Sequence, residues 1–309
     1  MIYTLTLNPA VDRELRVPAI SFGEVLRATG LRIDVGGKGF NVSRALRALN
    51  GESVALGFVG GHAGDLILEG LSRLGVPTNF VRIAGGETRT NVSVVAPDRH
   101  LKVNEAGPEV TREEELRLVD RVRDLSGPND WWVLSGSLPP GVSTGIYADL
   151  IRIVQAAGAC AVLDASGPSL AAGLEAGPFL VKPNAAEASE LTGLRVETRE
   201  EVKKAALAIQ RMGAAHVLVS LGRRGAVLLD RTRALVAVPP LVEEQNPVGA
   251  GDAMVAGLVF GLSRGLALSE ALAWAVAAGA AAASLPGTAF GSAARVAELA
   301  HRVDLTPLW

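Results

Sequence analysis

Residues 160–184 read CAVLDASGPSLAAGLEAGPFLVKPN, and this stretch decides the fold class. Two short apolar runs, 160–164 and 179–182, enclose a helix-like segment at 168–174. Neither run alternates apolar with polar residues, which is typical of strands buried on both faces of a parallel sheet. The stretch therefore predicts a strand–helix–strand unit of an α/β protein. Each run is followed by polar residues, in Asp164-Ala165-Ser166 and Lys182-Pro183-Asn184.

The same alternation continues on both sides of this unit. Strands that alternate with helices predict a mostly parallel central sheet with helices on both faces. Polar residues also follow the neighbouring strands, and because the carboxyl ends of parallel strands share one edge, we expect these groups to converge on one crevice. The predicted elements are helix 113–125, strand 131–135, helix 145–157, helices 185–191 and 199–213, and strand 215–220.

The amino-terminal part predicts a strand followed by a different kind of structure. Residues 1–7 are apolar and β-forming, and the turn after them delivers Asp12 to the sheet edge, either as a ligand-binding acid or as a solvated turn residue. Residues 10–35 and 85–105 are short, alternating and rich in β-formers. We expect them to form a small β lid inserted into a single domain spanning 1–309, and not a βα crossover.

Composition excludes several classes of protein. The chain has 309 residues, 49% of them apolar, which suffices for one large α/β core. Its 30 basic and 32 acidic residues leave no global basic surface, so we expect no nucleic-acid or membrane partner. The single cysteine, Cys160, cannot form an internal disulfide. The start of the chain does not resemble a signal peptide. The apolar segment 271–285 is shorter than the roughly 20 residues that span a bilayer. A cytoplasmic protein is expected.

Two glycine-rich stretches are predicted to open helices with uncovered backbone N–H groups, which attract anions. The first, at 36–46, includes Lys38 and Asn41 but lacks the spacing of a Walker A loop. The second, at 246–257, reads NPVGAGDAMVAG. Its Asp252 either accepts a proton from a group that attacks a bound phosphate or serves only as a helix cap.

Three further side chains are candidates for phosphate or metal contacts. Asn184 and Glu187 are spaced i, i+3 at a predicted helix start. They either bind a hydrated Mg²⁺ that contacts nucleotide phosphates or form a helix-capping pair. Arg89 is either a phosphate clamp or an exposed loop arginine. The four histidines stand at no ligand spacing, so no zinc or iron site is predicted.

Taken together, these motifs resemble the phosphofructokinase B branch of the ribokinase-like carbohydrate kinases, and within it the ketohexose-phosphate kinases. The resemblance covers the whole length, and the number and order of the motifs make it specific. The motifs that carry it are Asn8-Pro9-Ala10-Val11-Asp12, Gly36-Gly37-Lys38-Gly39 with Asn41, Thr88-Arg89, Lys102-Val103-Asn104-Glu105, Gly136-Ser137-Leu138-Pro139, Lys182-Pro183-Asn184 with Glu187, Ser220-Leu221-Gly222 with Gly225, and Gly249-Ala250-Gly251-Asp252.

The resemblance implies a ribokinase-like fold, ATP-dependent transfer of phosphate to a hydroxymethyl group, and dimerisation through the β lid. Asp252 would be the general base, and the N–H groups of Gly249, Ala250, Gly251 and Asp252 the anion hole. The sugar phosphate would be held by Asp12, Gly37, Lys38, Asn41, Arg89 and Ser137. ATP would contact Lys182, Asn184, Glu187, Ser220, Gly222, Gly225, Gly249 and Gly251, with Mg²⁺ held through water by Asn184 and Glu187.

The sequence favours fructose 1-phosphate as substrate, on the resemblance of residues 302–307 to 1-phosphofructokinases. Residues 246–248 are instead similar to tagatose-6-phosphate kinases, so tagatose 6-phosphate and fructose 6-phosphate remain alternatives on the same site. Three other classes are weighed against these: a non-catalytic sugar-phosphate sensor, a nucleotide-dependent oxidoreductase and a nucleoside kinase. The sensor would have little reason to keep Asp252 beside its glycines, the oxidoreductase fingerprint lacks its third glycine, and a nucleoside kinase would have little use for Lys38 and Arg89.

Overall fold

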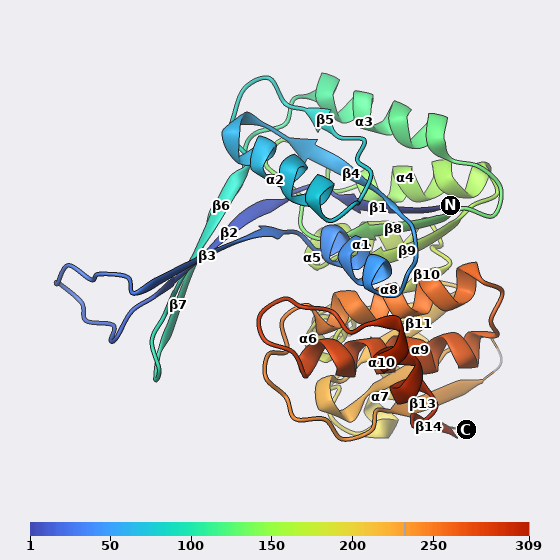
Figure 1. Cartoon of the computed structure of the whole chain (residues 1–309). Coiled ribbons are helices and arrows are strands. Elements are labelled where there is room, and N and C mark those ends of the chain that lie inside the picture. The colour runs from blue at the N-terminus through green and yellow to red at the C-terminus, as the bar shows by residue number, and fades with distance from the viewer. Residues whose placement is uncertain (232, 309) are drawn as a thin grey trace.

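The computed structural model describes residues 1–231 and 233–308, and its strands form two sheets (Figure 1). Seven neighbouring strands of the larger, central sheet run parallel, and three antiparallel strands extend it at one edge. In spatial order the central sheet consists of β14 (Asp304–Pro307), β13 (Ala234–Val238), β12 (Ala226–Leu229), β11 (His216–Ser220), β10 (Leu180–Val181), β9 (Cys160–Asp164), β8 (Trp131–Ser135), β1 (Ile2–Thr6), β4 (Val54–Val59) and β5 (Val81–Arg82).

Helices cover both faces of the central sheet, as the sequence predicts. Successive side chains of a strand point to opposite faces, so Leu134 of β8 joins the core on one face and Val133 joins the core on the other. The first face is covered by α3 (Arg112–Leu125), α4 (Ile146–Ala156), α5 (Gly167–Leu174), α6 (Ala185–Thr192) and α7 (Arg199–Arg211). The second is covered by α1 (Lys38–Ala48), α2 (Gly61–Arg73), α8 (Ala250–Ser263), α9 (Leu268–Ala283) and α10 (Ala293–Ala300).

The observed elements differ from the predicted ones mainly at one edge and at one strand. The strand predicted over 179–182 is reduced to Leu180–Val181, because Pro183 has no N–H with which to continue the ladder. The antiparallel strands β12, β13 and β14 were not predicted. The apolar segment 271–285 forms most of α9, which packs against α8. None of the helices in the described residues is long and apolar enough to cross a membrane.

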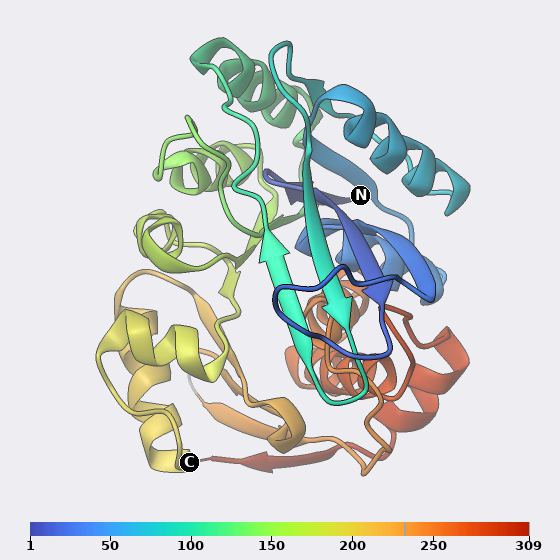
Figure 2. The same cartoon turned by 90° about the vertical axis from the view of Figure 1, so that its left-hand side faces the viewer.

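A second sheet of four strands lies at the carboxyl ends of the central strands and projects away from the body of the molecule (Figures 1 and 2). Its strands, in spatial order, are β3 (Gly30–Gly36), β2 (Ala10–Arg16), β6 (Arg89–Val95) and β7 (His100–Asn104). They come from the two segments, 10–35 and 85–105, in which the sequence predicts a β accessory unit.

The two faces of the second sheet differ in polarity. Residues paired directly across neighbouring strands lie on the same face, so the register assigns each side chain to a face. The apolar face consists of Leu15, Leu31, Ile33, Val92, Val94, Leu101 and Val103, with Arg13 among them. Several of these side chains are exposed, Leu31 and Val103 at 60% and 57%. The opposite, polar face carries Asp12, Arg32, Asp34, Asn91 and Asn104.

The start of α1 lies close against the end of β1, and glycine makes this approach possible. A Cβ on Gly39 would lie 2.6 Å from Thr6 Oγ1 and 2.7 Å from the Leu5 carbonyl oxygen. A larger residue would push the helix away from the sheet edge. Gly39 therefore places the first turn of α1, with Lys38 and Asn41, at the carboxyl edge of the central sheet.

Candidate active site

The loop that opens α8 has the geometry of an anion site. Gly249 caps the helix with φ of 83°, a left-handed conformation that favours glycine. The Ala250 N–H donates to the Pro247 carbonyl at 3.2 Å, whereas the N–H groups of Gly251 and Asp252 have no acceptor within the described residues. Two uncovered donors at a positive helix end can bind a phosphate oxygen.

Asp252 is buried beside this loop and does not cap the helix. Its Oδ2 accepts a hydrogen bond from Asn41 Nδ2 at 2.8 Å, and no bond from its carboxylate to the first N–H groups of α8 occurs in the part of the chain that the structure describes. Burial raises the pKa of Asp252 to about 6, with a further increase from the charge of Asp164. Asn41, Lys38 and Lys182 oppose this increase by stabilising the ionised form.

Asp164, at the end of β9, gathers two lysines next to Asp252. Its Oδ1 lies 3.0 Å from Lys38 Nζ and 3.3 Å from Lys182 Nζ, and Glu187 Oε1 lies 3.9 Å from Lys38 Nζ. Burial lowers the pKa of Lys38, but the nearby carboxylates of Asp164, Glu187 and Asp252 outweigh it and raise the pKa above its ordinary value. Lys38 is therefore charged, and the side chains of both lysines line the same cavity as Asp252.

Asp164 was not predicted as a site residue. Its position at the carboxyl end of a buried strand was the only signal in the sequence, because its partner Lys38 is 126 positions away. Its second oxygen, Oδ2, is buried and has no hydrogen-bond partner among the described residues.

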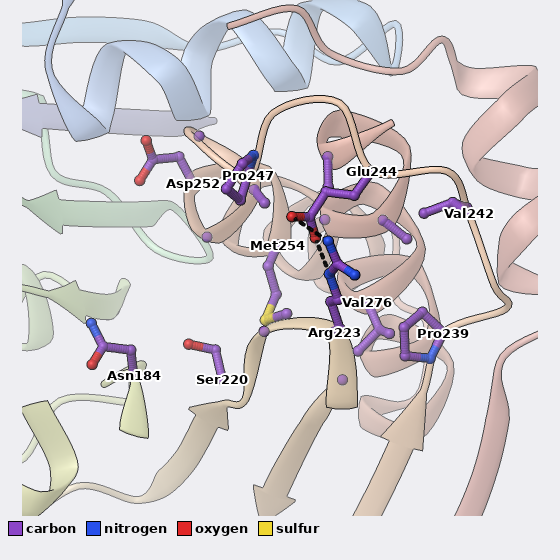
Figure 3. Close-up of a pocket in the computed structure, with 18 of the residues that line it drawn as sticks. Asn184, Ser220, Arg223, Pro239, Val242, Glu244, Pro247, Asp252, Met254 and Val276 are labelled. Atoms are coloured by element: carbon purple, nitrogen blue, oxygen red, sulfur yellow. Dashed lines mark hydrogen bonds and ion pairs between the residues drawn. The ribbon is translucent and has the colours of Figure 1, made fainter. Parts of the chain in front are cut away.

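A cavity of about 510 Å³ extends from Asp252 along α8 and α9. In Figure 3, Asp252 lies toward one end of the cavity, and Pro239 and Val242 toward the other. Met254 and Val276 also line it, so part of the wall is apolar and suited to a flat ring system. The predicted nucleotide-binding residues that line it are Lys182, Asn184, Ser220, Gly222, Gly225, Gly249 and Gly251.

An ion pair crosses this cavity between Arg223 and Glu244, two residues that the sequence did not single out. Arg223, in the short 3₁₀ turn Gly222–Arg224, donates from Nε and Nη2 to the two carboxylate oxygens of Glu244 at 2.8 and 3.0 Å (Figure 3). The pair joins the turn after β11 to the loop before α8. Because Arg223 is largely exposed, the pair contributes little to stability but fixes the relative position of the two loops.

Asn184 and Glu187 form the capping pair that was one of the two sequence hypotheses. The Asn184 side chain accepts from the Glu187 N–H, and the Glu187 side chain accepts from the Asn184 N–H, both at 2.9 Å. No cluster of three His, Cys, Asp or Glu side chains suited to a metal ion occurs in residues 1–231 and 233–308. A hydrated Mg²⁺ nevertheless fits the donors present, because the free Asp164 Oδ2 lies in the same lysine–carboxylate cluster as Glu187.

Apart from Lys38, the residues predicted to hold the sugar do not line the cavity, and they are only partly brought together. Asn41 contacts Asp252, and Gly37 caps α1 next to Lys38. Asp12 Oδ1 accepts from Asn91 Nδ2 at 2.8 Å on the polar face, and Ser137 is exposed after β8. Lys38 differs from this group, since it lines the cavity.

Arg89 has a structural role that the sequence did not predict. Its Nε and Nη2 donate to the Asn8 carbonyl at 3.2 and 3.0 Å, and its Nη1 donates to the Glu105 carbonyl at 3.1 Å. The Asn8 amide in turn donates to the Ala106 carbonyl at 2.9 Å and to the Leu138 carbonyl at 3.3 Å. Arg89 is therefore neither an unattached loop side chain nor a guanidinium with all its donors free for a phosphate.

Comparison with known proteins settles the family. The model of the pfkB family of carbohydrate kinases matches residues 3–295. The chain belongs to this family. As a member, it is a kinase that transfers phosphate to an alcohol group of its substrate. The geometry around Asp252, with an anion site, a buried carboxylate and a long cavity on one side, is what such a transfer requires.

Individual relatives of the kinase align over almost its whole length. A 1-phosphofructokinase of Escherichia coli is 36% identical over 309 residues, covering 99% of this chain and 98% of the relative. A 1-phosphofructokinase of Bacillus subtilis is 36% identical, covering 84% of each chain. Two solved structures of phosphofructokinase-2 from Escherichia coli each cover 97% of this chain and 98% of their own. The complex with potassium has a TM-score of 0.92 at 35% identity. The complex with fructose-6-phosphate has a TM-score of 0.89 at 34% identity.

Proposed function

We propose that this kinase uses ATP to phosphorylate fructose 1-phosphate on C6, which yields fructose 1,6-bisphosphate. The observation that carries the proposal is the nearly full-length similarity to curated 1-phosphofructokinases. The geometry of the site supports it, because a buried base, an anion site and a nucleotide-sized cavity lie in one continuous arrangement.

Asp252 is the proposed general base. It accepts the proton of the C6 hydroxyl while that oxygen bonds to the γ-phosphorus of ATP, and the bond from this phosphorus to the oxygen of ADP breaks. A pKa of about 6 leaves Asp252 mostly ionised near pH 7 and still basic enough to accept the proton. The free N–H groups of Gly251 and Asp252 stabilise the charge on the transferred group.

The cavity is the proposed ATP site, with the phosphates toward Asp252 and the base toward Pro239 and Val242. Lys38 and Lys182 face the phosphate end, so we assign Lys38 to the transferred phosphate as well as to the sugar side. Asn184 and Glu187, through water, and Asp164 would hold Mg²⁺. When bound, this ion would neutralise part of the negative charge on the phosphates.

The sugar phosphate is proposed to lie between Asp252 and the polar face of the second sheet. Asp12, Gly37, Asn41 and Ser137 would contact its hydroxyls. Arg89 would contact its phosphate only with the N–H groups that are not already bonded to carbonyl oxygens. The second sheet would then act as a lid over the sugar.

A homodimer through the second sheet is the proposed assembly. The apolar face defined above is exposed on a single chain, and water contact with so many aliphatic side chains is unfavourable. A second copy of the same sheet would cover it symmetrically, as most homodimers do.

The test of this function is ADP release with ATP and Mg²⁺ across fructose 1-phosphate, fructose 6-phosphate, tagatose 6-phosphate and fructose, compared by kcat/KM. A clear preference for fructose 1-phosphate is expected. The main competing function is phosphorylation of fructose 6-phosphate on C1, which the similarity to phosphofructokinase-2 favours. A preference for either 6-phosphate would overturn the proposed substrate, and no sugar-dependent ADP release with any of them would favour a non-catalytic sensor.

A further inference from the structure

Arg44 lies one helical turn after Asn41 in α1 and has no role in the function proposed above. We propose that Arg44 is a positioning residue that fixes the Asn41 amide against Asp252 and joins this contact to the loop after α9. The proposal rests on the assignment of Asp252 as the base. Three sets of contacts carry it.

The first set fixes the orientation of the Asn41 amide. Arg44 Nη1 donates to Asn41 Oδ1 at 3.3 Å, and Asn41 Nδ2 donates to Asp252 Oδ2 at 2.8 Å. A guanidinium only donates hydrogen bonds and an ionised carboxylate only accepts them, so the amide between them has one favourable orientation. Without Arg44, the amide could rotate and present its oxygen to the carboxylate of Asp252, which is repulsive.

The second set attaches Arg44 to the loop between α9 and α10. Its Nη2 donates to the Thr288 carbonyl at 3.0 Å, and its Nη1 donates to Thr288 Oγ1 at 3.4 Å. Its guanidinium carbon lies 5.3 Å from the centre of the Phe290 ring. A Cβ on Gly249 would lie 3.5 Å from the same ring. The ring of Phe290 therefore lies between Arg44 and the backbone of Gly249, which opens the anion site.

The third set reaches the second sheet. Arg32 of β3 donates from Nη2 to Thr288 Oγ1 at 3.5 Å, and its Nε pairs with Asp34 at 2.7 Å. Thr288 is thus contacted by one arginine from the polar face and by one from α1. Burial lowers the pKa of Arg44; the charge of Asp34 opposes this effect and the charge of Arg32 adds to it. The position of the second sheet is in this way connected to the orientation of Asn41.

The expected consequence is a change in the pH dependence of catalysis. The hydrogen bond from Asn41 stabilises ionised Asp252 and lowers its pKa, while Asp164 raises it and Lys38 and Lys182 lower it. Arg44→Met removes every donor but keeps an aliphatic stem beside Phe290. The pKa of Asp252 then rises, so the acid limb of the kcat profile moves to higher pH. The plateau of kcat falls about 10- to 100-fold, as misplacement of a reacting group does.

The experiment compares kcat–pH profiles of the full chain with saturating ATP, Mg²⁺ and its preferred sugar phosphate. The variants are Arg44→Met, Asn41→Ala, the double variant, and Arg47→Met as a matched control from the exposed side of α1. An upward shift in Arg44→Met that is absent in Arg47→Met supports the proposal. If Arg44 acts through Asn41, adding Arg44→Met to Asn41→Ala produces little further shift.

An unshifted acid limb in folded Arg44→Met, or fully additive shifts in the double variant, would overturn it. Should Arg44→Met not fold, Arg44→Lys keeps the charge. The Arg44→Lys variant is expected to show the same upward shift of the acid limb. A single ammonium cannot replace the planar guanidinium, which donates hydrogen bonds to both Asn41 and Thr288. Asp252→Asn separates the two proposals: if that variant keeps wild-type turnover, the base assignment fails, whereas an inactive Asp252→Asn with an unshifted Arg44→Met overturns only the role of Arg44.

Discussion

The central sheet and the second sheet of this kinase are built in opposite ways. Strands such as β8 and β9 are covered by helices on both faces and are buried almost throughout. The second sheet has only its polar face toward the site and leaves an apolar face exposed. Asp164 and Lys182, which serve the phosphate transfer in the proposed function, stand at the carboxyl ends of central strands, whereas Asp12 and Arg32 belong to the second sheet. The two sheets thus supply different groups to the proposed site, and α1 connects them through Arg44 and Asn41.

The largest effect is expected from Asp252→Asn, which tests whether the groups beside the central sheet carry out the phosphate transfer. Loss of the base should lower kcat about 10³-fold, while the thermal midpoint and ATP binding change little. Asp149→Asn, an exposed change on α4, is the control for the substitution itself. Steady-state kinetics measures kcat, and calorimetry measures the thermal midpoint and ATP binding. Turnover near that of the wild type would show that the carboxylate is not the base.

A smaller effect is expected from Lys38→Met, which removes a charge between the cavity and the proposed sugar site. If Lys38 stabilises the transferred phosphate, kcat falls about 10²- to 10³-fold and the two KM values change less. Lys204→Met, on the exposed side of α7, should leave all constants unchanged. A rise in the sugar KM alone, with kcat intact, would assign Lys38 to the sugar phosphate only.

A third prediction concerns the pH dependence of the wild type and of Asp164→Asn. Because Asp252 must be ionised to accept a proton and its pKa is about 6, kcat/KM should fall as the pH decreases through about 6. The charge of Asp164 raises this pKa, so Asp164→Asn should move the acid limb to lower pH, opposite to Arg44→Met. A limb that moves upward in Asp164→Asn would mean that the freed lysines no longer stabilise ionised Asp252.

The smallest effect on turnover is expected from changes to the apolar face. Val103→Lys places a charge in the proposed dimer interface and should weaken self-association about 10-fold or more, with the fold intact. Sedimentation velocity over a range of protein concentrations measures this. Leu116→Lys, on exposed α3, is the matched control. If Val103→Lys and the wild type sediment alike at every concentration, the apolar face is not the interface.

The sequence predicted the central sheet well because its signal is local. Strands β8 and β9 occur at the predicted residues, since an unbroken apolar run can only be stable when covered on both faces. The antiparallel strands β12 to β14 were missed: β14 pairs with β13, which lies far earlier in the chain, whereas β12 and β13 pair locally and were overlooked. The glycines and acids of the site were visible as motifs.

Long-range polar contacts could not be predicted. The pairing of Lys38 with Asp164 joins residues 126 positions apart, and the contact of Arg44 with Thr288 joins residues 244 positions apart. Arg89 was predicted from its planar fork of donors as a phosphate clamp or an exposed side chain, and the structure adds bonds from this fork to two carbonyl oxygens. A sequence motif identifies a functional group but not how many of its donors the fold itself uses.

The contacts around Asn8 have a mechanical consequence. Hydrogen bonds of Arg89 and of the Asn8 side chain hold three points of the chain together: Asn8, before β2; Arg89, at the start of β6; and residues 105–106, just after β7. With three connections held at one point, a rigid-body movement of the sheet would pivot there. Asp12, close to the pivot, would hardly be displaced, while the distant loops 17–29 and 96–99 would sweep the widest arc (Figure 1). The sheet would behave as a lever whose short arm carries Asp12 and whose long arm amplifies small rotations.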